Sequence, residues 1–88
     1  MTTIWKFPLT VTDSQRVEMP EGAQLLTVQL QGNQPCLWAV VDSDNETEDR
    51  YFEIYDTGNP IRGDINETAK YIATFQQGPF VWHVFETL

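Results

Sequence analysis

The chain has 88 residues, with 13 acidic against 5 basic side chains and a formal net charge of −8. This length predicts one domain spanning residues 1–88, and the acidity steers such a domain toward cationic partners. A chain of this charge is not expected to bind nucleic acid directly, because phosphate contacts require a basic face.

Two further features of the sequence indicate where in the cell the protein is expected. No segment approaches the roughly 20 apolar residues of a membrane helix, so no membrane association is expected. Cys36 is the single cysteine and cannot form an internal disulfide, which favours a reducing, cytoplasmic location. It lies in an apolar run, where a cysteine is usually buried.

Apolar residues recur with a period of two along nearly the whole chain, which predicts strands. In chain order we expect strands over Thr2–Phe7, Gln15–Met19, Gln24–Gln31, Cys36–Val41, Arg50–Asp56, Tyr71–Gln76 and Phe80–Glu86. Between the fifth and sixth strands, the Ile61–Lys70 segment is compatible with either a coil or a short helical turn near 66–70, capped by Asn66 and running through Ala69. About seven short strands with regular turn signals predict an all-β, antiparallel sandwich or small barrel.

The alternation also predicts which side chains are buried. Leu26, Val28 and Leu30 are expected on one face, and the Cys36–Val41 strand is apolar on both faces, which suggests a central strand. The expected core comprises Trp5, Phe7, Val17, Leu26, Val28, Leu30, Trp38, Val40, Phe52, Ile54, Phe75, Trp82 and Val84.

The densest charge in the chain lies between two of these strands. Five carboxylates fall within eight residues, which we expect to form a loop held out by the strands: Asp42, Asp44, Glu46, Glu48 and Asp49. Such a loop can bind a divalent cation, contact a basic partner surface, or remain solvated.

The calcium interpretation rests on spacing alone. Four of the five acids, followed by Glu53, match the ligand positions of a twelve-residue calcium loop. However, Thr47 stands where that loop needs a glycine, Asp49 stands where an apolar residue is usual, and the flanks read as strands. We therefore expect no metal and no cofactor, and take the five acids as a partner-binding surface.

The sequence contains only weak signs of a catalytic site. His83 is the only histidine and alternates onto the same face as Val81 and Phe85, which is typical of a structural strand residue. A Cys36–His83 dyad stays open, because distant strands can be neighbours. The sequence has no metal-ligand spacing and no glycine-rich phosphate loop, so the chain is not expected to be an enzyme.

An alternative site uses the basic and aromatic residues that follow the acids. Aromatic rings can stack on a nucleobase while a guanidinium holds a phosphate. The residues that would form such a nucleotide-binding pocket are Arg50, Tyr51, Tyr55, Arg62 and Lys70.

Five segments of the chain form a characteristic combination. They are Ile4-Trp5-Lys6-Phe7-Pro8-Leu9, Met19-Pro20-Glu21-Gly22-Ala23, Gln34-Pro35-Cys36-Leu37-Trp38-Ala39, Tyr71-Ile72-Ala73-Thr74-Phe75 and Trp82-His83-Val84-Phe85-Glu86. Together they resemble a family of small uncharacterised bacteriophage and prophage proteins. The resemblance implies a phage context in a bacterial host cell and brings no catalytic residues.

These features together predict a non-enzymatic phage-type accessory protein that blocks a host protein, such as a defence or nucleic-acid-binding component, through its acidic surface. Two alternatives remain: a binder that sequesters a nucleotide immune signal, and a structural or morphogenetic phage protein. A homo-oligomer is compatible with a domain this small, because small domains often gain stability by association.

Overall fold

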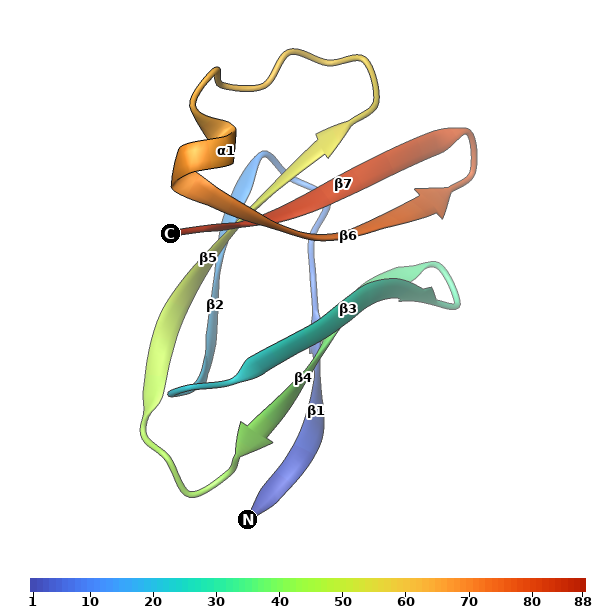
Figure 1. Cartoon of the computed structure of the whole chain (residues 1–88). Helices are drawn as coiled ribbons and strands as arrows, with labels where there is room; N and C mark the ends of the chain where they lie inside the picture. Colours follow the sequence, from blue (N-terminus) through green and yellow to red (C-terminus); the bar gives the residue numbers. More distant parts are fainter.

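The computed structural model describes all 88 residues, as seven strands and one helical turn (Figure 1). In chain order these are β1 (Thr2–Pro8), β2 (Ser14–Pro20), β3 (Gln24–Gln31), β4 (Gln34–Asp42), β5 (Thr47–Asp56), α1 (Ile65–Thr68), β6 (Ala69–Gln77) and β7 (Phe80–Thr87). The predicted all-β fold is confirmed, and each predicted strand is present with bounds that extend by up to three residues.

The strands form two antiparallel sheets, with strand orders β1-β4-β3 and β2-β5-β7-β6. Because neither sheet closes on itself, the fold is a sandwich. The β3 edge of the first sheet lies beside the β6 edge of the second (Figure 1). There the Gln77 amide nitrogen donates to the Asn33 carbonyl oxygen at 3.1 Å, which ties the two hairpin tips together.

Two of the hairpins are closed by turns whose first residue is glycine. Gly32 and Gly78 have φ of 63° and 56° and begin the two-residue turns before β4 and β7. A type II′ turn requires a positive φ at this position, and its twist matches that of the flanking strands. The turn signals in the sequence therefore correspond to real hairpins.

The core lies between the sheets. Five of the residues expected there are buried: Val28, Phe52, Ile54, Phe75 and Val84. Others expected there, Phe7, Val17, Leu30 and Trp82, are partly buried and pack against this cluster. The cluster also contains residues that were not expected, namely Leu9, Met19, Ala23, Leu37, Ala39, Val41 and Ala73.

The predicted core face of β3 is wrong at Leu26. The register of β3 against β4 shifts between Leu25 and Thr27, which marks a β-bulge. A bulge inserts one residue and changes which side chains face inward. Leu26 is consequently exposed, whereas Leu25 packs against the core.

The predicted core face of β4 is also wrong, although its central position is confirmed. Leu37 and Ala39 face the core, and Trp38 lies on the opposite face because successive strand residues alternate. Val40 shares that outer face and is only partly buried. Trp5 is 40% exposed, because β1 is an edge strand with no neighbour on its other side.

The segment between β5 and β6 forms a loop and a single helical turn. The turn begins at Ile65, and its N-cap is Asp64, so the predicted Asn66 cap is wrong by two residues. The Asp64 carbonyl oxygen accepts hydrogen bonds from the Glu67 and Thr68 amides. With only this four-residue turn, the structure contains no helix that could cross a membrane.

Candidate functional site

The acidic segment is not the long loop predicted from the sequence. Asp42 is the last residue of β4, and Glu48 and Asp49 belong to β5, so only residues 43–46 lie between strands. Successive strand residues point to opposite faces. The Glu48 and Asp49 side chains therefore diverge and cannot share one ligand.

A second turn lies against this segment. The Glu21 amide donates to the Glu46 carbonyl oxygen at 2.8 Å, and the Asn45 amide nitrogen donates to the Glu21 carbonyl oxygen at 3.0 Å. These bonds join the β2–β3 turn to the β4–β5 turn at the end of the sandwich that also carries the amino terminus (Figure 1).

We call this region the acidic end. It combines the five predicted acids with two more from β2 and its turn: Glu18, Glu21, Asp42, Asp44, Glu46, Glu48 and Asp49. Sequence reasoning missed Glu18 and Glu21, because the β2–β5 pairing brings Glu18 there and hydrogen bonds between the two turns bring Glu21.

Three carboxylates of the acidic end have close partners within the chain. The Met1 amino group contacts Asp42 Oδ1 at 3.0 Å and Asp44 Oδ2 at 2.6 Å. The backbone N–H of Asp44 also donates to Asp42 Oδ1, and this bond, with the amino group, lowers the pKa of Asp42. Glu48 accepts a hydrogen bond from the Gly22 amide at 3.0 Å.

The remaining contacts leave the acidic end strongly negative. Arg16 approaches Asp49 only to 3.7 Å, and the side chains of Glu18, Glu21 and Glu46 have no hydrogen-bond or ion-pair partner. Nowhere in the chain do three or more acidic, histidine or cysteine side chains converge in a way that could hold a metal ion.

Glu18 and Asp49 lie directly opposite each other across the β2–β5 pair. Like charges at such positions destabilise a sheet by a few tenths of a kcal/mol to about 1 kcal/mol. The acidic end therefore carries more negative charge than the fold itself requires.

The five residues of the alternative nucleotide site do not form one site. Arg50 and Lys70 line a cavity of about 340 Å³ at the β3–β6 edge. Tyr51 and Tyr55 lie on the outer face of the second sheet, and Arg62 lies in the loop that covers this face.

Both arginines of that set already hold carboxylates. Arg50 Nε and Nη2 donate to the Glu86 carboxylate at 2.5 and 2.9 Å, and Nη1 donates to the Ala23 carbonyl oxygen at 2.5 Å. The contact with Glu86 raises the pKa of Arg50. Arg50 thus has little remaining capacity to bind a phosphate, and nucleotide binding stays a prediction.

Arg62 belongs to a network around Glu53, which is only 7% exposed. Arg62 Nε and Nη2 donate to the two Glu53 oxygens at 2.8 and 2.6 Å, and the Tyr55 and Thr87 hydroxyls each donate to Glu53 at 2.6 Å. Hydrogen bonding to Arg62, above all, holds the pKa of Glu53 at about 2. Arg62 also contacts Asp64, so the network fastens the 57–64 loop to the sheet.

His83 and Cys36 lie in different sheets, on β7 and β4. Both His83 ring nitrogens are hydrogen-bonded to hydroxyl groups, Nε2 to Thr57 at 2.7 Å and Nδ1 to Thr74 at 3.0 Å. Cys36 is buried, as predicted. No contact joins the two residues as a nucleophile and its base.

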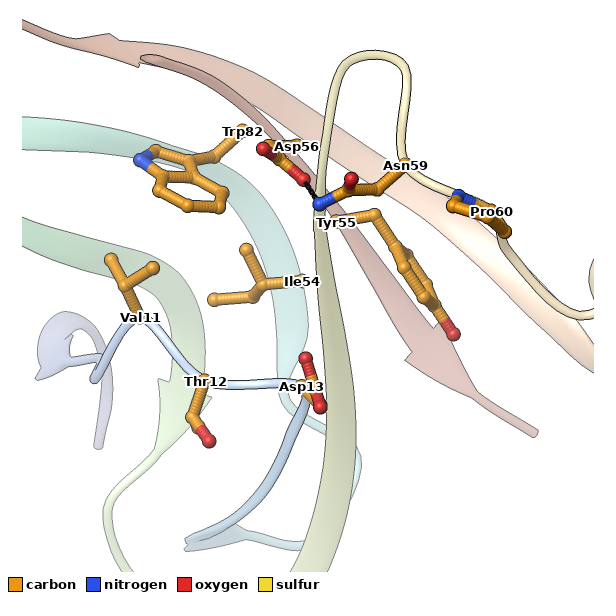
Figure 2. A pocket seen from close by; sticks show the side chains of 9 residues that line it. All are labelled: Val11, Thr12, Asp13, Ile54, Tyr55, Asp56, Asn59, Pro60 and Trp82. Carbon is orange, nitrogen blue, oxygen red and sulfur yellow. Dashed lines mark hydrogen bonds between the residues drawn. The ribbon is translucent and has the colours of Figure 1, made fainter.

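The largest cavity is a cleft of about 570 Å³ next to the 57–60 loop (Figure 2). It is lined by Val11, Thr12, Asp13, Ile54, Tyr55, Asp56, Asn59, Pro60 and Trp82. Its wall combines apolar side chains such as Val11, Ile54 and Trp82 with polar ones, and Asp13 and Asp56 bring two carboxylates to it.

Neither carboxylate in this cleft is paired with a basic side chain. Asp56 accepts a hydrogen bond from the Asn59 amide, and Asp13 has no side-chain partner. The buried Trp82 Nε1 also has no partner, but in Figure 2 it points away from the carboxylates. The cleft can accommodate a cationic group on an aliphatic stem.

Comparison with known proteins gives a family and no function. A family model described as "Domain of unknown function (DUF7352)" matches residues 1–88. No curated protein matches the chain. No solved structure matches it either.

Proposed function

We propose that this chain, which belongs to the DUF7352 family over its whole length, is a non-enzymatic binding protein whose acidic end occupies a basic surface of a partner protein. The observation that carries the proposal is the union of two turns at one end of the sandwich, where seven carboxylates gather. Positive charge there comes from Arg16 and the Met1 amino group, and Arg50 attracts Glu48 from nearby.

Charge complementarity explains how such a surface works. A dense negative patch accelerates the encounter with a positive patch and disfavours partners of the wrong charge. Glu18, Glu21 and Glu46 are free to take part, because no group in the chain neutralises them. The β-sandwich beneath them fixes the spacing of the carboxylates.

The unfavourable Glu18–Asp49 pair supports the same proposal. Surface charge needed only for solubility can be placed anywhere, and placing two acids opposite each other costs stability. A basic partner would relieve this repulsion on binding.

The cellular setting of the proposal is a bacterial host cell, with the chain acting as a phage-type accessory protein that blocks a defence or nucleic-acid-binding component. The support for this part is the resemblance of the strand and turn segments to phage and prophage proteins. A host protein that binds nucleic acid would offer the basic surface that the acidic end requires.

The proposal is tested by capture from bacterial lysate on the immobilised chain, followed by identification of the captured protein. The wild type is compared with Glu46→Lys in the acidic end and with Glu67→Lys in α1, which changes the net charge equally. Wild type and Glu67→Lys should capture the same protein at low salt and release it at high salt. Equal capture by Glu46→Lys, or no salt-sensitive capture, would contradict the proposal.

A further inference from the structure

The outer face of the β2-β5-β7-β6 sheet carries an aromatic cavity that is separate from the acidic end. Tyr55, Tyr71, His83 and Phe85 line this cavity of about 380 Å³, and Ile61 closes it from the covering loop. Strand pairing places these side chains together, since Tyr55 lies opposite His83 and Tyr71 lies opposite Phe85. Figure 2 shows the Tyr55 ring pointing away from the Asp13 cleft.

The three rings meet edge to face. The Phe85 ring centroid is 6.2 Å from that of Tyr55 and 5.7 Å from that of Tyr71, with interplanar angles of 70° and 71°. No parallel slot therefore separates Phe85 from either tyrosine, as stacking on a flat base would need. Rings inclined in this way form the walls of a box.

The rings are held in place by their own hydroxyl groups. The Tyr55 hydroxyl donates to Glu53 at 2.6 Å, and the Tyr71 hydroxyl is 2.7 Å from Thr74 Oγ1. Both hydroxyls are thus engaged by residues that do not line the cavity. Donation to a carboxylate also increases the negative charge on the Tyr55 ring, which strengthens its attraction for a cation.

Charge selects the class of ligand. No lysine or arginine lines the cavity, and Arg62, which follows Ile61 in the covering loop, is bound to Glu53 and Asp64, so it is not available for a phosphate. The chain as a whole carries a net charge of −8. A cation is attracted to such a box, whereas an anion is repelled.

We propose that the box formed by Tyr55, Tyr71 and Phe85 binds a methylated ammonium group. Aromatic boxes recognise such groups by cation–π attraction to several rings at once. The group could belong to a free choline-type molecule or to a methylated lysine side chain of a protein. This proposal does not depend on the acidic end or on its partner.

The first test is a calorimetric titration of the wild-type chain with choline and with its uncharged isostere, in which a tert-butyl group replaces the trimethylammonium. Choline should bind, and the isostere should bind about tenfold more weakly or not at all, because it has the same shape without the charge. Equal binding of both compounds, or binding of neither together with failure of the peptide described below, would overturn the proposal.

Matched variants locate the site. Tyr71→Leu should weaken choline binding about tenfold, and Tyr71→Phe should retain it, because the hydroxyl only contacts Thr74. Tyr51→Leu is the control. Tyr51 lies on the same sheet face and is 52% exposed, close to the 55% of Tyr71, but it does not line the cavity. Equal losses in the Tyr51 and Tyr71 leucine variants would overturn the assignment.

A peptide containing trimethyl-lysine, compared with its unmethylated form, distinguishes the two sources of the group. Tighter binding of the methylated peptide than of choline identifies a protein side chain, and the reverse order identifies a free molecule. Either result supports the box as the site if Tyr71→Leu weakens the binding about tenfold. Binding that Tyr71→Leu leaves unchanged would contradict it.

Discussion

Replacing Glu53 by glutamine should destabilise the fold in a way that depends strongly on pH. Glu53 is nearly buried and accepts hydrogen bonds from Arg62, Tyr55 and Thr87. These contacts lower its pKa from an ordinary value of 4.5 to about 2. A difference of this size corresponds to about 3 kcal/mol of stability at neutral pH.

The sign follows from the direction of the pKa change. Because the pKa of Glu53 is lower in the folded state, its contribution is fully present above pH 4.5 and is lost as the pH falls through about 2. The variant lacks this titration. The difference in free energy of unfolding between wild type and Glu53→Gln, which we call the gap, should therefore be about 3 kcal/mol at pH 7 and less than about 1 kcal/mol near pH 2.

Urea denaturation of both proteins across this pH range measures the gap. The other carboxylates titrate in both proteins, so their effects cancel in the difference. The exposed Glu67→Gln is the control and should show no gap at either pH. A gap that stays constant from pH 7 to pH 2, or an NMR titration of Glu53 near its ordinary pKa, would refute the reasoning.

Three further outcomes follow from the packing. Arg50→Met should lower the free energy of unfolding by about 3 kcal/mol or more, because it leaves the Glu86 carboxylate unpaired where it is only 12% exposed. Adding Glu86→Leu should restore much of this loss, as measured by urea denaturation of the two single variants and the double variant. Leu25→Ala should cost about 2 kcal/mol in the same assay, whereas Leu26→Ala should stay within about 0.5 kcal/mol, since the bulge turns Leu26 outward. Millimolar calcium should leave the Tm unchanged, because the acidic segment divides between two strands and lacks convergent ligands; a rise in Tm would contradict this.

The sequence predicted the strands well because their pattern is local. Alternating apolar residues, glycine turns and proline positions each act within a few residues, and they placed all seven strands. The direction in which a strand faces depends on its partners. The Leu26 error arose from a bulge, and a bulge is a relation between two strands that no single segment reveals.

The error on β4 has a different cause. This strand is apolar on both faces, so its pattern gave no reason to prefer Leu37 and Ala39 over Trp38 and Val40. The size of the Trp38 side chain suggested burial in the core. The small Ala39 faces inward instead, opposite Trp5 of the edge strand β1.

The candidate sites were predicted only in part. The run of acids was visible in the sequence, but its union with Glu18 depends on strand pairing across the sheet, and its union with Glu21 depends on hydrogen bonds between two turns. The Glu53–Arg62 network could not be foreseen, because an alternating strand gives no sign that a later loop will cover its polar face. Tyr71 and Phe85 come together for the same reason, through the pairing of β6 with β7.

The central claim is that the acidic end binds a basic partner. Its most direct test is the affinity of the captured partner for wild type, Glu46→Lys and Glu67→Lys, measured at several salt concentrations. The account predicts that Glu46→Lys weakens binding about tenfold at low salt, that the difference shrinks as salt rises, and that Glu67→Lys matches wild type. Equal weakening by the two variants, or a wild-type affinity that does not change with salt, would contradict it.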